Sequence, residues 1–141
     1  MDFLDTNVLI YAFTPDSDKV AAAEALLADK PLVSVQGLNE MVNVLRRKRA
    51  FSWVEVDEVL DTVARLCRVQ SQSLATHQHA RELVQRYRLG WWDSLQLASA
   101  LEAGAETFWS EDLQHGLLME QQLRVRNPFR LDPESLLSGR H

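Results

Sequence analysis

Short β-type runs alternate with longer helical patterns along almost the whole chain, and this alternation restricts the choice of fold more than any other feature. The β-type runs are expected at 2–5, 31–35, 107–110 and 123–127, with a weaker candidate at 67–73. Helical patterns are expected at 6–12, 18–29, 37–49, 53–66, 76–88 and 92–103. Strands separated by helices build parallel sheets, because a parallel connection has to cross a face of the sheet. The sequence therefore predicts an α/β fold with a central, mainly parallel sheet of four to five short strands flanked by helices.

Length and composition indicate one globular domain. A chain of 141 residues can bury a sizeable core, and we expect a single domain over 1–131 followed by a C-terminal tail over 132–141 that frays. Met1 is followed by an acidic residue and no long apolar segment occurs, so neither a signal peptide nor a membrane span is expected. The single cysteine, Cys67, excludes an internal disulfide, lies in a helical pattern as a core residue, and fits a reducing, cytoplasmic location.

The charge distribution leaves two interpretations of the basic residues open. A net charge of −5 is unlike that of most nucleic-acid-binding domains, which are basic. Positive charge is nevertheless concentrated in one run of four residues, Arg46, Arg47, Lys48 and Arg49. This run either contacts an RNA backbone or forms a solvated helix end, where cations suit the helix dipole.

Four acidic residues stand at the ends of expected elements: Asp5, Glu40, Asp93 and Asp112. In parallel sheets, sites form beyond the carboxyl ends of the strands. Carboxylates that converge there would repel one another and lose hydration, and a cation is the usual remedy. Because the set contains only oxygen ligands, it favours Mg²⁺ or Mn²⁺ over zinc. The four histidines, His77, His79, His115 and His141, lack metal-ligand spacing and are expected to be solvated.

Each acid also has a structural interpretation that needs no chemistry. Asp93 with Gln96 matches a capping box, and Glu40 near a helix start is favoured by the helix dipole. Asp5 and Asp112 fit turn or cap positions. Asp5, however, ends a strand that a parallel sheet should bury, and this combination of acids favours a metal site over four separate caps.

The order of these motifs resembles that of the PIN-domain ribonucleases, and above all the VapC-like toxins of bacterial type II toxin–antitoxin pairs. The likeness is carried by MDFLDTNVLIYAF, by NE at 39–40, by GWWDSLQLASALEAGAETFWSEDLQHG and by RVRNPF. These stretches cover nearly the whole chain, from the first expected strand to Phe129. DTN alone is common, but the ordered set of DTN, Glu, WDSLQLASA and SEDLQHG is specific.

The resemblance implies a PIN-like three-layer fold with four acids gathered at one end of the sheet. Residue by residue, the acids carry over to Asp5, Glu40, Asp93 and Asp112, which would hold Mg²⁺ or Mn²⁺, with Glu40 either binding the metal or orienting the attacking water. Asn7 and Ser110 match polar residues that support the ligands or orient water. Glu111, beside Asp112, is the alternative to the fourth acid.

The activity that the resemblance implies is metal-dependent endoribonuclease hydrolysis of RNA phosphodiester bonds, by the toxin of a bacterial toxin–antitoxin pair. The implied partners are RNA, a cognate antitoxin protein and a second copy of the chain in a homodimer. Two alternatives stay open: a PIN-type RNA-processing nuclease without a toxin role, and a catalytically silent PIN-like binding module. The presence of all four acids does not favour the silent module.

A second enzyme class, the haloacid-dehalogenase phosphatases, also begins with a strand that ends in Asp. Its site needs a second Asp two residues later, where this chain has Asn7. It also needs a late catalytic lysine, whereas Lys48 is the last lysine in the chain. The motifs therefore do not support this class.

Asp93 begins an apolar helical stripe instead of standing on a polar face. Residues four, seven and eight positions later share its face of the helix, and these are Leu97, Ala100 and Leu101. The resemblance explains the arrangement, since it implies that this end of the helix points at the metal site. The neighbouring Trp91 and Trp92 either pack as a wall of the site or stack on RNA bases.

Overall fold

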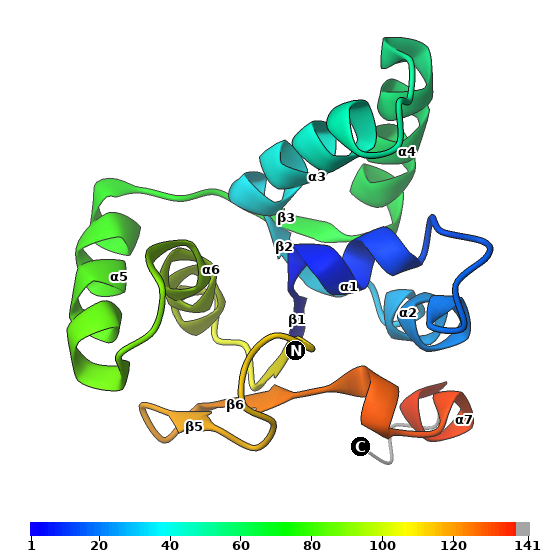
Figure 1. The fold of residues 1–141 in the computed structure, drawn as a ribbon. Helices are drawn as coiled ribbons and strands as arrows, with labels where there is room; N and C mark the ends of the chain where they lie inside the picture. The colour runs from blue at the N-terminus through cyan, green and yellow to red at the C-terminus, as the bar shows by residue number, and fades with distance from the viewer. Residues whose placement is uncertain (138–141) are drawn as a thin grey trace.

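The computed structural model describes residues 1–137, which form an α/β fold with one six-stranded sheet between two layers of helices (Figure 1). The strands are β1 (Asp2–Leu4), β2 (Leu32–Ser34), β3 (Arg68–Gln70), β4 (Thr107–Trp109), β5 (Leu118–Met119) and β6 (Leu123–Arg126). Their order in the sheet is β3-β2-β1-β4-β6-β5. Neighbouring strands run parallel except β5 and β6, which are antiparallel. The predicted α/β fold and mainly parallel sheet are confirmed.

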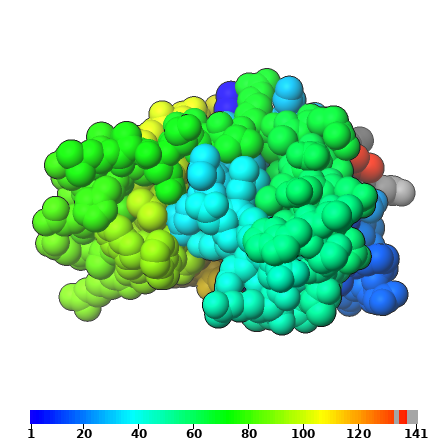
Figure 2. All heavy atoms as spheres, turned by 90° about the horizontal axis from the view of Figure 1, so that it is seen from above, coloured from blue at the N-terminus to red at the C-terminus, as the bar shows by residue number. Residues whose placement is uncertain are grey.

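The helices lie on both faces of this sheet. They are α1 (Thr6–Tyr11), α2 (Val20–Leu27), α3 (Val35–Arg47), α4 (Trp53–Leu66), α5 (Leu74–Tyr87), α6 (Trp91–Glu102) and α7 (Pro133–Leu137), with a 3₁₀ turn, η1, over Pro128–Arg130. Figure 1 shows α5 and α6 on one side and α1, α2 and α7 on the other. Seen from above in Figure 2, α3 lies at the surface between the α5–α6 side of the molecule and α4.

Alternating strand residues build two separate cores, because successive side chains of a strand point to opposite faces of the sheet. Phe3 and Phe108 stack with ring centroids 5.5 Å apart and pack in the core beneath α5 and α6. Leu4 and Trp109, the next residues of the same strands, pack in the core beneath the helices of the other face. Both faces of β1 and β4 are therefore buried, and the last residues of these strands are held rigidly. Cys67 lies in this second core, as predicted.

The sheet has one strand more than predicted. The hairpin between β5 and β6 turns through Glu120 and Gln121, which have φ values of 50° and 57°. Left-handed turn positions of this kind are usually marked by glycine or asparagine. Because Glu120 and Gln121 are neither glycine nor asparagine, the sequence contained no sign of this turn, and β5 was not predicted.

The prediction that the tail frays is wrong for residues 133–137, which form α7. The side chain of Leu136 is 2% exposed and packs in the same core as α2. Residues 138–141, and with them His141, lie outside the described residues. Two histidines expected to be solvated are also engaged: His79 lies 2.8 Å from Glu120, and His115 accepts a hydrogen bond from the backbone of Asn127. Among residues 1–137, no helix is both long enough and apolar enough to cross a bilayer.

Candidate active site

The carboxyl ends of β1 and β4 form the edge at which the sequence predicted a site. The two strands pair in parallel, with Leu4 opposite Trp109, so the residues that follow them lie side by side. From β1 the chain crosses to β2 on one side, and after β3 it crosses back to β4 on the other. In α/β sheets, ligands bind at such a point, because the connecting helices diverge there and leave a crevice.

Asp5 follows β1 directly at this edge of the sheet and is held in place on both of its carboxylate oxygens. It is the N-cap of α1, and its Oδ1 accepts a hydrogen bond of 2.7 Å from the backbone N–H of Thr6. Its Oδ2 accepts a hydrogen bond of 2.9 Å from the hydroxyl of Ser110, which follows β4. The residue is only 7% exposed. Asp5 is thus a rigid, buried carboxylate between two strand ends.

The charges of the predicted acids act on one another. The pKa of Asp5 is raised from its ordinary 3.8 to about 7, mainly by burial. The charges of Asp93 and Asp112 contribute to this rise, and the hydrogen bonds from Ser110 and Thr6 oppose it. The pKa of Asp93 is also raised, first by burial and then by the charges of Asp112 and Glu40. Asp5, Asp93 and Asp112 therefore act on one another, and Glu40 joins them through Asp93.

Ser110 and Asn7 hold the first and fourth acids in register. The buried hydroxyl of Ser110 donates to Asp5 and accepts a hydrogen bond of 3.1 Å from the backbone N–H of Asp112. The side-chain amide of Asn7, in the first turn of α1, donates to Oδ2 of Asp112 at 2.6 Å. Both residues thus lie where supporting groups are expected.

Glu111, the alternative fourth acid, is engaged elsewhere. Its carboxylate accepts hydrogen bonds of 2.7 Å from the hydroxyl of Tyr11 and 2.6 Å from the Nζ of Lys19. Burial would raise the pKa of Glu111, but the bonds from Lys19 and Tyr11 outweigh it and hold the pKa below its ordinary value. Asp112, and not Glu111, is the acid whose charge acts on Asp5 and Asp93.

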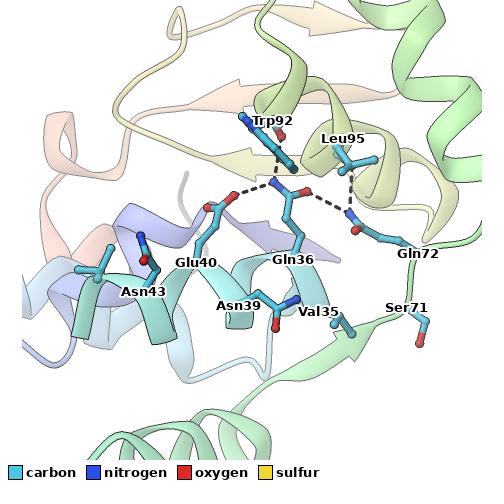
Figure 3. Close-up of a pocket in the computed structure, with 10 residues that line it drawn as sticks. Val35, Gln36, Asn39, Glu40, Asn43, Ser71, Gln72, Trp92 and Leu95 are labelled. Atoms are coloured by element: carbon cyan, nitrogen blue, oxygen red, sulfur yellow. Dashed lines mark hydrogen bonds between the residues drawn. The ribbon is translucent and has the colours of Figure 1, made fainter. Parts of the chain in front are cut away.

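Glu40 and Asp93 are brought together by a glutamine contact between α3 and α6. The amide nitrogen of Gln36 donates to Glu40 at 2.6 Å and to the backbone carbonyl of Trp92 at 3.2 Å. Its carbonyl oxygen accepts a hydrogen bond of 3.2 Å from Gln72. Figure 3 shows this row of side chains between the two helices. The start of α6, and with it Asp93, is thereby tied to Glu40.

The capping-box interpretation of Asp93 and Gln96 is wrong. The N-cap of α6 is Gly90, which makes no side-chain cap, and Asp93 lies in the first turn of the helix. Gln96 is buried and donates to the hydroxyl of Thr6 at 2.9 Å, while its oxygen accepts a hydrogen bond of 2.8 Å from Ser34. Asp93 is consequently free of a capping role.

Sequence reasoning missed the polar network that underlies the acids. Ser34 caps α3 through the backbone N–H of Gly37, and Gln96 joins Ser34 to Thr6. A Cβ at Gly37 would stand 3.2 Å from the Thr6 hydroxyl, so a larger residue would crowd the network. The available signal was Gln96 itself, a polar residue in an otherwise apolar part of its helix.

Two pockets adjoin the acids and share the side chain of Val44. One, of about 900 Å³, lies between α3 and the start of α6 and includes Glu40 and Trp92. The other, of about 380 Å³, lies between α1 and α3 and includes Asn7 together with Lys48 and Arg49. One pocket thus has amide, hydroxyl, aliphatic and aromatic side chains beside Glu40, and the other has two cationic side chains.

The side chains of the basic run, 46–49, differ in whether they contact the rest of the fold. The guanidinium of Arg46 donates to the backbone carbonyl of Phe51 at 2.9 Å and lies 4.7 Å from the ring centroid of Trp53. Among residues 1–137, neither Lys48 nor Arg49 has an acidic partner within ion-pair distance. Arg46 is thus an exposed residue at the end of α3 with contacts inside the fold, whereas Lys48 and Arg49 line the pocket that includes Asn7.

The donor set fits an oxygen-coordinated divalent cation in its chemistry. All four predicted acids offer oxygen ligands, and the charges of neighbouring acids add to the effect of burial in raising the pKa values of Asp5 and Asp93. A cation would relieve this repulsion. Within the described chain, no three acidic, histidine or cysteine side chains already stand in a metal-coordinating arrangement. Asp5, Glu40 and Asp112 instead accept hydrogen bonds from neighbouring side chains.

Comparison with known proteins places this arrangement in context. The profile of a family described as "PIN domain" matches residues 3–116. A toxin–antitoxin complex from Klebsiella pneumoniae is similar in structure, with a TM-score of 0.68, 19% identity, and coverage of 91% of this chain and 98% of that chain. VapC20 from Mycobacterium tuberculosis, a toxin that cleaves the sarcin–ricin loop, has a TM-score of 0.64, 18% identity, and coverage of 77% and 87%.

A third solved structure adds a complex with DNA. VapBC2 from Rickettsia felis, bound to a fragment of its promoter, has a TM-score of 0.61, 20% identity, and coverage of 89% of this chain and 97% of that chain. At these identities the structural likeness concerns the fold. No curated protein sequence matches the chain significantly.

Proposed function

The chain belongs to the PIN domain family, and on this basis we propose that it is a divalent-metal-dependent endoribonuclease that hydrolyses phosphodiester bonds in RNA. The observation that supports the proposal is the electrostatic interaction of Asp5 with Asp93 and Asp112, and of Asp93 with Asp112 and Glu40, near the carboxyl ends of β1 and β4. Burial raises the pKa values of Asp5 and Asp93, and the charges of neighbouring acids add to the rise. A stable fold tolerates such a cluster when a cation or substrate compensates for it.

In this proposal the four acids hold Mg²⁺ or Mn²⁺. When bound, the cation supplies Lewis acidity for water attack and compensates the charge that develops on the phosphate oxygens. Ser110 fixes the orientation of Asp5 and the start of the turn that carries Asp112, and Asn7 fixes the carboxylate of Asp112. These two residues act through the acids that they position.

The cationic pocket supports a nucleic-acid substrate. Lys48 and Arg49 line a pocket that also contains Asn7, the hydrogen-bond partner of Asp112. Positive side chains beside a phosphodiester-cleaving site neutralise backbone phosphates and draw an anionic substrate toward acids that would otherwise repel it. We assign phosphate contacts to Lys48 and Arg49, and a structural role to Arg46.

The toxin role rests on the structural neighbours. The complexes from Klebsiella pneumoniae and Rickettsia felis pair a PIN-like fold with an antitoxin. We propose that this chain is likewise the toxin of such a pair, active as a homodimer, and that its antitoxin blocks the site by directing an arginine at the acids. Expression of the wild type should then slow bacterial growth, and Asp93→Asn should remove this effect.

Cleavage of RNA by the purified chain tests the proposal. The protein, freed from any bound partner, is incubated with total RNA and with isolated tRNA and rRNA in Mg²⁺, in Mn²⁺ or in EDTA. We expect cleavage in either metal, none in EDTA, and products with a 5′-phosphate and a 3′-hydroxyl. Asp5→Asn and Asp93→Asn should each lower the rate by about a hundredfold or more.

The matched control is Asp61→Asn, which removes an exposed acid of α4 outside the site and should leave the rate unchanged. RNA that is bound but never cut by the wild type would instead identify a silent binding module. Cleavage without any effect on growth would identify a processing nuclease without a toxin role.

A further inference from the structure

The 900 Å³ pocket beside the acids is distinct in character from its cationic neighbour. It is lined on one side by α3 and on the other by Trp92 and Leu95 of α6 (Figure 3). Among its described lining residues, Glu40 is the only one that carries a charge. The rest of the lining is aliphatic, aromatic, amide or hydroxyl, which suits an uncharged, flat and partly polar occupant.

Trp92 presents an unused aromatic face to this pocket. Its side chain is 65% exposed, and within residues 1–137 its indole ring has no aromatic or cationic partner. Trp91, its neighbour, packs against the core and meets the ring of His77 edge-on at 5.1 Å. The two interpretations of the tryptophan pair therefore separate: Trp91 packs, whereas Trp92 is available to a ligand.

Asn39 and Asn43 add hydrogen-bonding groups that the fold does not use. Both are exposed on α3, and neither side-chain amide has a hydrogen-bond partner in the part of the chain that the structure describes. Gln36 and Gln72 line the same pocket, but their side-chain amides are already hydrogen-bonded to each other, to Glu40 and to α6. Amides of this kind pair with the donor and acceptor edges of nucleobases.

The pocket is continuous with the reaction site. Glu40 lines it and also acts electrostatically on Asp93. Val44, one turn further along α3, borders both this pocket and the pocket of Lys48 and Arg49. Along α3, the aromatic pocket, which includes Glu40, therefore meets the cationic pocket at Val44. This arrangement suits a base in the first pocket and a neighbouring phosphate of the same RNA strand in the second.

We propose that this pocket binds the base of an unpaired nucleotide next to the scissile phosphate, stacked on Trp92 with its polar edge toward Asn39 and Asn43. The inference rests on the proposed ribonuclease function and names how its substrate is recognised. Unpaired bases that stack on aromatic side chains are the common basis of protein–RNA recognition, because every base has a π-face. A protein partner would be expected to meet more apolar surface and fewer free amides.

Binding of two matched oligonucleotides separates base stacking from phosphate attraction. The probes are a short fluorescent oligoadenylate and an abasic ribose-phosphate oligomer of the same length, titrated by fluorescence anisotropy in EDTA at low salt. The four carboxylates repel both probes equally in every variant, and no cleavage occurs. The wild type should bind the base-containing probe about tenfold or more tightly than the abasic one.

Trp92→Ala should weaken binding of oligoadenylate by about 5- to 100-fold and reduce the preference for the base-containing probe to near unity. Trp92→Phe keeps an aromatic face and should retain most of the preference. Asn39→Ala should lower it by a smaller factor. Trp53→Ala is the matched control, because Trp53 is 56% exposed but lies at the start of α4, outside this pocket.

Three results would overturn the inference. If the wild type cleaves RNA but Trp92→Ala keeps the base preference, the pocket does not read a base, and the ribonuclease function stands. If Trp92→Ala changes the sedimentation of the protein and not its base preference, the pocket is an interface between copies of the chain. If the wild type neither binds nor cuts RNA, the proposed function itself fails.

Discussion

Replacement of Asp5 by asparagine should stabilise the metal-free protein, and should do so at neutral and alkaline pH. The Asp5 carboxylate is 7% exposed and accepts hydrogen bonds from Thr6 and Ser110. Asparagine has nearly the same shape, keeps an oxygen for the Thr6 N–H, and offers the Ser110 hydroxyl an N–H in place of an oxygen. The substitution therefore removes a buried charge with little change in packing.

The raised pKa of Asp5 sets the direction and size of the effect. Because this pKa is about 7 in the fold against an ordinary 3.8, the folded protein holds a proton that the unfolded chain releases between those values. The free energy of unfolding of the wild type therefore falls as pH rises through this window. At about 1.4 kcal/mol per pKa unit, the whole loss is roughly 4 kcal/mol, an upper limit that water penetration reduces. Roughly 3 kcal/mol of it falls between about pH 5 and about pH 8.

Urea unfolding in EDTA at these two pH values measures the effect, followed by intrinsic tryptophan fluorescence, to which the buried Trp109 contributes. Relative to the wild type, Asp5→Asn should gain up to roughly 3 kcal/mol more at about pH 8 than at about pH 5. Asp61→Asn, the exposed control, should show no such difference. If Asp5→Asn and the wild type differ by the same amount at both pH values, burial and repulsion do not raise the pKa of Asp5, and the electrostatic argument for the site is wrong.

Three further predictions follow from the same geometry. At matched ionic strength, millimolar Mn²⁺ should raise the melting temperature of the wild type, and the rise should shrink in Asp93→Asn. At a hundredfold excess of metal over its Kd, the expected stabilisation is roughly 2.7 kcal/mol. Equal melting temperatures with and without metal would mean that these acids do not form a cation site. Lys48→Ala and Arg49→Ala should weaken RNA binding and reduce the dependence of the affinity on salt. Arg46→Ala should instead lower the free energy of unfolding by about 1 kcal/mol and leave the RNA affinity unchanged. Sedimentation at micromolar concentration should show a dimer, and a strict monomer would refute the homodimer.

The fold class was readable from the sequence because it depends on local patterns. Runs such as LVS and TFW are short, apolar and bounded by helical stretches, and both became fully buried strands. The residues that follow such strands lie at the same edge of a parallel sheet, and this holds for any order of the strands. Asp5 and Asp112 could therefore be assigned to one crevice before any contact was known, and their oxygen ligands indicated the type of cation.

The supporting contacts could not be read from the sequence, because they join residues that are remote along the chain. Lys19 and Glu111, 92 positions apart, form the pair that removes Glu111 from the acids. Gln96 reaches Thr6 across 90 positions, so its helix-capping pattern was misleading. Local spacing contains no information about which distant side chain will complete a hydrogen bond.

The different exposures of Trp91 and Trp92 also depend on tertiary packing. The side chains of adjacent residues in a helix differ by about 100° in direction. From the sequence alone, either tryptophan could face a packing partner. Only the placement of α5 beside α6 decides that Trp91 meets His77 while Trp92 is left 65% exposed over a pocket. The sequence by itself placed the acids at the ends of strands and helices and predicted their metal chemistry. The packing of helices from distant segments decided which side chains support those acids and which are free to meet a substrate.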